Sequence, residues 1–227
     1  MVTIRKDILT NDHYYHIYSR SIAKYTIFNN EHEYNRMLEL IDLCRFKDFN
    51  YRFSKLKSLL PQNQAEIIDS IKSLSNATVG IIAFCIMPTH IHLILKQITE
   101  NGITEFMRKV LDSYSKFFNT RHNRSGPLWV GHFKNVLIST NEQLLHATRY
   151  LHLNPTSAGL VEKPEDWKFS SYSEYIHPPI ERIETICTKS DLFDITPARY
   201  KKFVDDQQAY QRSLAIIKHL LIDNYTG

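Results

Sequence analysis

The stretch Met87-Pro88-Thr89-His90-Ile91-His92-Leu93-Ile94-Leu95 sets two histidines, one residue apart, inside an apolar run of strand character. Side chains alternate between the faces of a strand, so His90 and His92 are expected on one face and Ile91 on the other. Their Cα atoms would lie roughly 6.5–7 Å apart, a spacing at which two imidazoles can bind one cation. The alternative is a pair of half-buried histidines that merely hydrogen-bond to their surroundings, and the pattern alone leaves both open.

The composition is that of an ordinary globular protein. The 227 residues are 43% hydrophobic and 23% charged, enough for one full-sized domain with an appendage or for two small domains. The cysteine count of 3 is odd and without paired spacing, which argues for reduced thiols and a cytoplasmic setting. No apolar segment is long enough to cross a bilayer, so we expect no membrane contact. The net charge of +4 permits a nucleic-acid partner without requiring one.

The order of expected elements predicts an α+β fold with a ferredoxin-like or RRM-like antiparallel sheet and helices packed on one face. Residue alternation and apolar runs predict strands over 13–19, 78–87, 90–96 and 133–138. Helical spacing predicts helices after Asn30, over 103–120 and over 141–154, the last of which Pro155 is expected to stop.

Two parts of the chain lie outside this minimal order. Residues 46–76 read as a helical insertion that Pro61 divides. We expect residues 1–160 to form the main domain, and 161–227 to form a linker and a mainly helical C-terminal extension in which Thr196-Pro197 begins a helix. Three roles stay open for the extension, which could cover the core, form a dimer contact or contact DNA. Its apolar residues are Phe203, Ile216, Ile217 and Leu220.

The expected helix over 141–154 carries a tyrosine on a polar arc. Tyr150 and Asn154 are four residues apart and so lie on one face, away from the leucines of that helix. Tyr114, in contrast, follows the apolar stripe of the helix over 103–120 and is expected in the core. Tyr150 is therefore the better candidate for chemistry, although periodicity alone leaves a structural role open.

Three motifs resemble those of the HUH single-strand DNA nucleases. Pro88 to Leu93 looks like their metal-binding motif of His, bulky hydrophobic and His. Their nucleophile helix and its exit are similar to Arg149-Tyr150-Leu151-His152-Leu153-Asn154-Pro155 and Ala158-Gly159-Leu160-Val161, and the segment between resembles Gly126-Pro127-Leu128-Trp129 and His132-Phe133-Lys134. From about Tyr15 to Tyr175, the chain resembles the single-tyrosine transposases of the insertion-sequence type, and most of all the REP-associated tyrosine transposase branch.

The resemblance implies a transposase that cleaves and rejoins single-stranded DNA near hairpins through a covalent 5'-phosphotyrosine, in DNA transposition or in the processing of repeat hairpins. It implies a divalent metal ion, magnesium or manganese, with His90 and His92 as ligands and Tyr150 as nucleophile. Asn154 stands where relatives have a Gln or Asn that can complete the ion's shell. Residues 1–160 would then be the catalytic domain. Related enzymes include dimers, so monomer and homodimer both stay open.

The segment over 108–134 combines positive charge with aromatic rings and has a single acid, Asp112. Charge that follows phosphates and rings that stack on bases are how single strands are usually held. The alternative is a solvated basic loop beside core aromatics. The residues expected to contact DNA are Lys109, Lys116, Arg121, Arg124, Trp129 and Lys134, with Arg149 from the following helix.

Other functions fit parts of the pattern. A relative that has lost catalysis would bind DNA hairpins without cutting them. An RNA-binding module on the same fold would carry aromatic residues in place of paired histidines on its central strands. A small zinc hydrolase would use the histidines and leave Tyr150 without a role.

Overall fold

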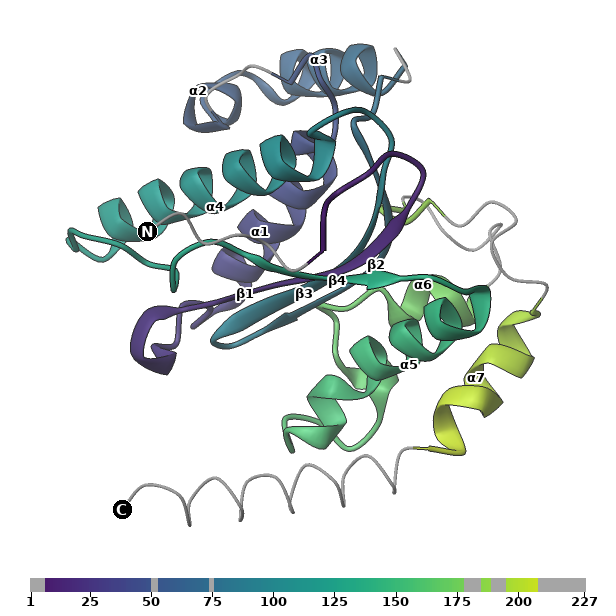
Figure 1. The fold of residues 1–227 in the computed structure, drawn as a ribbon. Helices are drawn as coiled ribbons and strands as arrows, with labels where there is room; N and C mark the ends of the chain where they lie inside the picture. The colour runs from purple at the N-terminus through teal and green to yellow at the C-terminus, as the bar shows by residue number, and fades with distance from the viewer. Residues whose placement is uncertain (1–6, 50–52, 74–75, 178–184, 189–194, 208–227) are drawn as a thin grey trace.

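The centre of the molecule is an antiparallel sheet (Figure 1). The computed structural model describes residues 7–49, 53–73, 76–177, 185–188 and 195–207. The sheet has the strand order β2-β3-β1-β4, and its strands are β1 (Tyr14–Arg20), β2 (Val79–Met87), β3 (His90–Gln97) and β4 (Lys134–Ile138). Every neighbouring pair runs antiparallel, so the expected α+β fold is confirmed. The strands lie within about a residue of their predicted positions.

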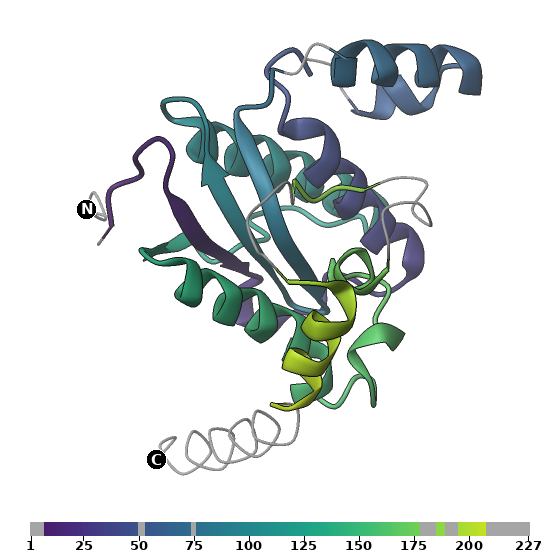
Figure 2. The ribbon, with the colours of Figure 1, turned by 90° about the vertical axis from the view of Figure 1, so that its right-hand side faces the viewer.

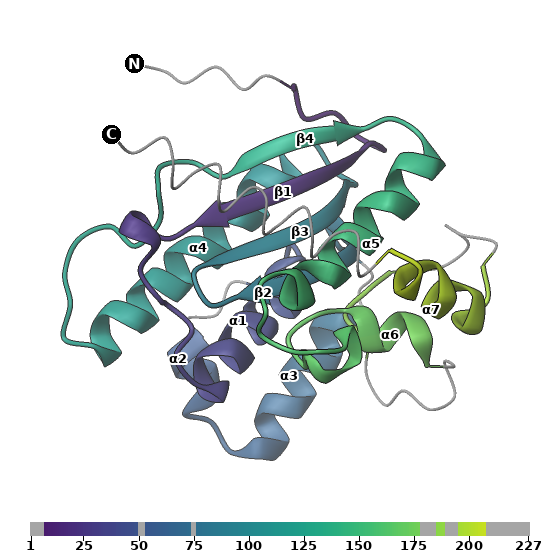
Figure 3. The same cartoon turned by 90° about the horizontal axis from the view of Figure 1, so that it is seen from below.

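Helices cover both faces of the sheet (Figures 1 and 3). The connections between strands carry α1 (Glu31–Cys44) and α4 (Gly102–Arg121), which lie on one face as the sequence predicted. The opposite face is covered by α5 (Asn141–Ser157) and α6 (Tyr172–Ile176), which the one-face expectation did not include. The physical reason lies in β2, which is buried at every position and so needs apolar neighbours on both sides.

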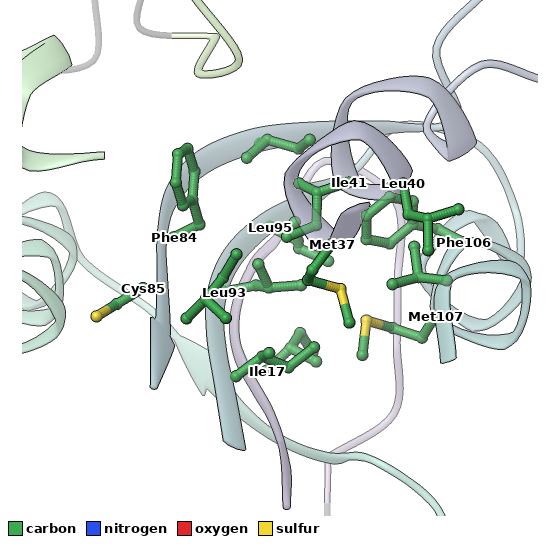
Figure 4. Close-up of a cluster of buried hydrophobic side chains, with 14 of the residues drawn as sticks. Ile17, Met37, Leu40, Ile41, Phe84, Cys85, Leu93, Leu95, Phe106 and Met107 are labelled. Carbon is green, nitrogen blue, oxygen red and sulfur yellow. The ribbon is translucent and has the colours of Figure 1, made fainter. Parts of the chain in front are cut away.

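The main core lies between the sheet and the α1/α4 layer (Figure 4). Ile17, Leu93 and Leu95 point from the strands toward this layer and are fully buried. Their partners from the two helices include Met37, Ile41, Phe106 and Met107. Cys85 points to the other side of the sheet. Burial of these side chains, each worth about 1.5–3 kcal/mol, fixes which face of β3 is left for polar groups.

Helix ends follow the capping residues. The Asn30 side chain accepts a hydrogen bond from the Glu33 amide at 3.2 Å, and Thr140 accepts one from the Gln143 amide at 3.1 Å. The expected stop at Pro155 is wrong, because α5 continues to Ser157. A proline this near the C-terminus removes one helical hydrogen bond, and the turn comes instead at Gly159, whose φ is +68°.

The insertion over 46–76 contains α2 (Phe53–Lys57) and α3 (Pro61–Ser73), which lie beyond α1 at one end of the molecule (Figure 2). Short 3₁₀ turns cover Ile22–Lys24 and Pro164–Asp166. The expected last helix is present as α7 (Pro197–Asp205), which packs against α5 and α6. Ile216, Ile217 and Leu220 lie outside the described residues, and the division at residue 160 stays a prediction.

Candidate active site

The two histidines of β3 share one face of the sheet, opposite the main core. Their ring centroids are 4.9 Å apart and the rings are nearly perpendicular, at 85°. Strand pairing puts Arg20 beside His90 and Tyr18 beside His92. The alternation that the sequence predicted therefore brings both imidazoles into one polar surface, because the apolar residues between them face α1 and α4.

Tyr150 reaches this surface from α5. The centroid of its ring lies 6.1 Å from that of His92, at an interplanar angle of 87°. The side chain is 41% exposed. Tyr114 is fully buried and donates a hydrogen bond to the Ile27 carbonyl at 2.5 Å, as a core tyrosine should. Of these two tyrosines, Tyr150 is the one that lies beside the histidine pair and stays open to a substrate.

A third histidine joins the site, one that local sequence patterns did not single out. The Nε2 atom of His16, on β1, lies 2.9 Å from the Nδ1 atom of His92. The two rings are stacked, with their centroids 5.1 Å apart. The His16 ring is also 6.1 Å from that of Tyr150. The alternation of β1, with Tyr15 and Ile17 turned to the core, already assigned His16 to the other face. The pairing of β1 with β3 was the missing information, because it sets His16 diagonally across from His92.

Each histidine of the β3 pair has one nitrogen held and one free. His90 Nδ1 is 2.9 Å from the Thr89 hydroxyl, and His92 Nδ1 is held by His16. Neither Nε2 atom has a hydrogen-bond partner among the described residues. An imidazole whose Nδ1 is fixed by a neighbour presents Nε2 in a defined direction, which is the usual arrangement of a metal-ligating histidine.

Burial keeps these imidazoles neutral. It lowers the pKa of His16 to about 4, and burial followed by the nearby Arg20 charge lowers the pKa of His90 to about 4. Burial, then the neighbouring His16, His90 and Arg20, holds the pKa of His92 well below its usual range. A neutral imidazole has a lone pair that a cation could use, so these side chains are in the protonation state that a metal ligand needs.

Arg20 adds a positive charge at the end of β1. Burial raises the pKa of the Tyr150 phenol, and Arg20 opposes that rise because its guanidinium favours the phenolate. The Arg20 side chain is exposed. Local sequence patterns did not single out Arg20. Its place beside His90 makes it a candidate site residue that strand pairing reveals.

The donors present fit a divalent ion with open coordination positions. Asn154 lies one turn after Tyr150 and is half-buried, and its amide nitrogen is buried without a hydrogen-bond partner in the described part of the chain. Within the residues that the structure describes, no group of three or more His, Cys, Asp or Glu could hold a metal. The candidate set is therefore the Nε2 atoms of His90 and His92 and the Asn154 amide, which suits a catalytic ion better than a closed structural site.

The expected DNA-contacting residues divide between the two sides of the sheet. Lys134 is exposed and pairs in register with Tyr18, so it lies on the histidine face. Arg124 donates hydrogen bonds to the Asn119 side chain at 2.9 Å and the Pro127 carbonyl at 2.7 Å, which hold the loop after α4. The three remaining expected contacts with charged side chains in this segment lie on α4, in the opposite layer, and are Lys109, Lys116 and Arg121.

Two of these expectations need correction. Trp129 is 8% exposed and its indole donates to the Leu111 carbonyl at 3.2 Å, so its ring belongs to the core and offers no open face to a base. Arg149 turns toward α7, with its guanidinium 4.0 Å from the Phe203 ring centroid and 2.7 Å from His146 Nδ1. Both side chains stabilise the fold around the site instead of lining it.

Comparison with known proteins first shows which family the chain resembles. Residues 48–154 match the model of the family described as transposase IS200 like, and this range contains His90, His92, Tyr150 and Asn154. The expected resemblance to single-tyrosine transposases is thereby confirmed.

The particular relatives point to one branch. A REP-associated tyrosine transposase of Haemophilus influenzae is 31% identical to this chain over 102 residues, which cover 40% of this chain and 57% of the relative. This chain thus matches a little over half of that protein's length. The solved structure of a REP-associated tyrosine transposase bound to a REP hairpin has the same fold, with a TM-score of 0.52 and 15% identity. The alignment covers 86% of this chain and 96% of that one.

No helix in the described ranges has the length and apolar character needed to cross a bilayer.

Proposed function

We propose that this protein cleaves and rejoins single-stranded DNA next to a hairpin, with Tyr150 as the nucleophile that forms a 5'-phosphotyrosine. The observation that carries the proposal is the meeting of Tyr150 with the histidine pair of β3, at 6.1 Å between the Tyr150 and His92 rings. The family match over residues 48–154 supports it, as does the common fold with a relative that was solved bound to a REP hairpin. Transposition and the processing of repeat hairpins both use this reaction.

In the proposed reaction, the Tyr150 oxygen attacks a backbone phosphorus while the bond from phosphorus to the 3' oxygen breaks. Tyr150 gives up its proton, and the departing 3' oxygen takes up a proton to become a free hydroxyl. The phosphotyrosine bond keeps the energy of the original ester, so a 3' hydroxyl of another strand end can reverse the step without ATP.

Side chains around Tyr150 have distinct tasks in this proposal. An unperturbed tyrosine has a pKa of about 10, so the phenol needs help to ionise. Arg20 supplies positive charge beside the phenol and would contact a non-bridging phosphate oxygen. His16 would act through His92, by keeping the His92 Nε2 atom directed at the metal position. Lys134, on the same face, would contact the backbone further along the strand.

The proposal includes a divalent ion, Mg²⁺ or Mn²⁺. When bound, such an ion neutralises charge on the phosphate and acidifies nearby hydroxyl groups. His90 and His92 would hold it through Nε2, and Asn154 would contribute its amide oxygen. Two imidazole nitrogens favour Mn²⁺ over Mg²⁺, which makes Mn²⁺ the better probe.

The test is formation of a covalent adduct on a hairpin oligonucleotide with single-stranded flanks in the presence of Mn²⁺, read on a denaturing gel. Tyr150→Phe should bind the oligonucleotide normally and form no adduct. The matched control is Tyr18→Phe, which removes the hydroxyl of a tyrosine on the same face, with its ring centroid 6.0 Å from that of His92, and should keep the adduct. EDTA should abolish the adduct and Mn²⁺ restore it.

Two outcomes contradict the proposal. An adduct with Tyr150→Phe would mean that another residue is the nucleophile. Tight hairpin binding by the unaltered protein, with no adduct under any metal condition, would identify a DNA-hairpin-binding protein that does not cut.

A further inference from the structure

A cavity on the α1/α4 side of the sheet has no part in the chemistry described above. It has a volume of about 990 Å³ and lies between α1, α2 and α4. In Figure 1 these helices stand on the opposite side of the sheet from α5, which carries Tyr150. The sheet and its main core therefore separate this cavity from the histidine face.

The cavity lining is strongly basic. Five arginine and lysine residues border it against one acid, Asp112. Lys109 and Lys116 have no ion pair within the described part of the chain. They are seven residues apart on α4, which puts both on the same side of the helix, roughly 10 Å apart along its axis. The other three bordering cations are Arg36, Arg108 and Arg121.

Arg36 lies in a slot between aromatic rings. Its guanidinium carbon is 3.6 Å from the centroid of the Phe53 ring and 5.1 Å from that of Phe117. The Arg36 Nε atom is buried and has no hydrogen-bond partner among the described residues. Burial of an unsatisfied guanidinium N–H costs free energy unless an anion or another acceptor reaches it. A basic cavity lined by rings, with an unsatisfied donor in its wall, fits a ligand that combines phosphates with bases.

A second hollow extends the cavity toward the candidate active site. It has a volume of about 680 Å³, shares Asp112, Lys116 and Thr120 with the first, and reaches Arg124. Beyond Arg124, the chain pairs with the end of β1, where the Val130 amide donates to the Arg20 carbonyl at 2.8 Å. Positive side chains thus line the two hollows from Lys109 to Arg124, and the chain beyond Arg124 continues to Arg20 on the surface that holds Tyr150. The length of this row favours a polynucleotide over a single nucleotide.

We infer that the cavity and its extension bind the backbone of single-stranded DNA that flanks the hairpin, as a second contact separate from the cleavage site. The inference depends on the proposed function for the identity of the partner and adds where the flanking strand runs. It also gives the insertion over 46–76 a role, since α2 forms one wall of the cavity.

The experiment compares two oligonucleotides with the same hairpin, one with a flank of a few nucleotides and one with a long single-stranded flank. Binding is measured by fluorescence anisotropy over a range of salt concentrations. The double variant Lys109→Gln/Lys116→Gln should weaken binding of the long-flank DNA by about tenfold and reduce the slope of log affinity against log salt by about 1.4, as two phosphate contacts to a single strand predict. Short-flank binding should change less than about twofold.

The matched control is Lys163→Gln/Lys202→Gln, which removes the same charge from exposed positions outside both hollows. It should leave both affinities within about twofold. Equal weakening by the two double variants, or no preference for the long flank in the unaltered protein, would overturn the inference. Adduct formation on the short-flank DNA is scored in parallel. Absence of the adduct with the unaltered protein would count against the proposed function, whereas the dependence of affinity on flank length tests the cavity alone.

Discussion

The buried histidine of α5 and the histidine pair of β3 differ in how many of their ring nitrogens are bonded. His152, on α5 itself, is fully buried, with Nδ1 2.7 Å from the Tyr200 hydroxyl and Nε2 2.8 Å from the Ser171 hydroxyl. Both nitrogens of His152 are satisfied, so this residue joins α5 to α6 and α7 and has nothing left to offer a ligand.

The histidines of β3 are bonded on one side only. His90 and His92 each have Nδ1 held, by Thr89 and His16, and Nε2 without a partner among the described residues. The comparison teaches that burial alone does not distinguish a structural histidine from a ligand. The useful criterion is whether one nitrogen is fixed while the other is left open toward a surface that a substrate can reach.

The largest expected effect is on catalysis by the site that contains the β3 histidine pair. His92→Ala should reduce adduct formation by about a thousandfold or more, because a metal contributes several kcal/mol to stabilising the transition state. Hairpin affinity should change less than about threefold. The control is His13→Ala, which changes an exposed histidine just before β1. Near-normal adduct formation by His92→Ala would mean that His92, like His152, has no part in catalysis.

Loss of His152 should have the larger effect on the free energy of unfolding. His152→Ala should lower the free energy of unfolding by about 3 kcal/mol, since it removes two hydrogen bonds and leaves a cavity. His92→Ala should cost about 1 kcal/mol, because it loses one hydrogen bond, to His16. Urea denaturation of the two variants measures both values. If His92→Ala proves the more destabilising, the β3 pair is a structural feature.

A smaller effect tests the link from His16 to the metal. His16→Ala should weaken Mn²⁺ binding by about 10–100-fold, the usual cost of losing a group that orients a ligand. His16→Gln, which can still meet His92 Nδ1, should recover part of the affinity. Calorimetric titration with Mn²⁺ in the absence of DNA gives the values. An unchanged affinity in His16→Ala would mean that His92 needs no support from β1.

Much of the fold and the centre of the site followed from local sequence patterns. Alternation in β3 put His90 and His92 on one face, and helical spacing separated Tyr150 from the core tyrosine Tyr114. These predictions succeeded because apolar and polar residues have a strong preference for opposite sides of an element, whatever the element packs against. Capping at Asn30 and Thr140 was equally local, since it depends on residues within one turn.

Predictions that depended on contacts between distant segments fared less well. Trp129 looked like a base-stacking residue beside lysines, but its ring fills the core next to Leu111. Arg149 sits beside Tyr150 in sequence and yet packs on Phe203 of α7. Amphipathic side chains suit a surface and a partly buried contact equally well, so the sequence could not tell which of the two each would make.

By itself, the sequence determined the α+β class, the shared face of the histidine pair and the position of Tyr150 away from the apolar stripe of its helix, because each depends on the regular geometry of a single strand or helix. Only the tertiary structure decided that His16 supports His92, that Arg20 stands beside the phenol, and that the lysines of α4 face away from the site. The reason is that strand pairing and helix packing bring together residues far apart in the chain. The spacing of residues along one segment does not specify which other segments it contacts.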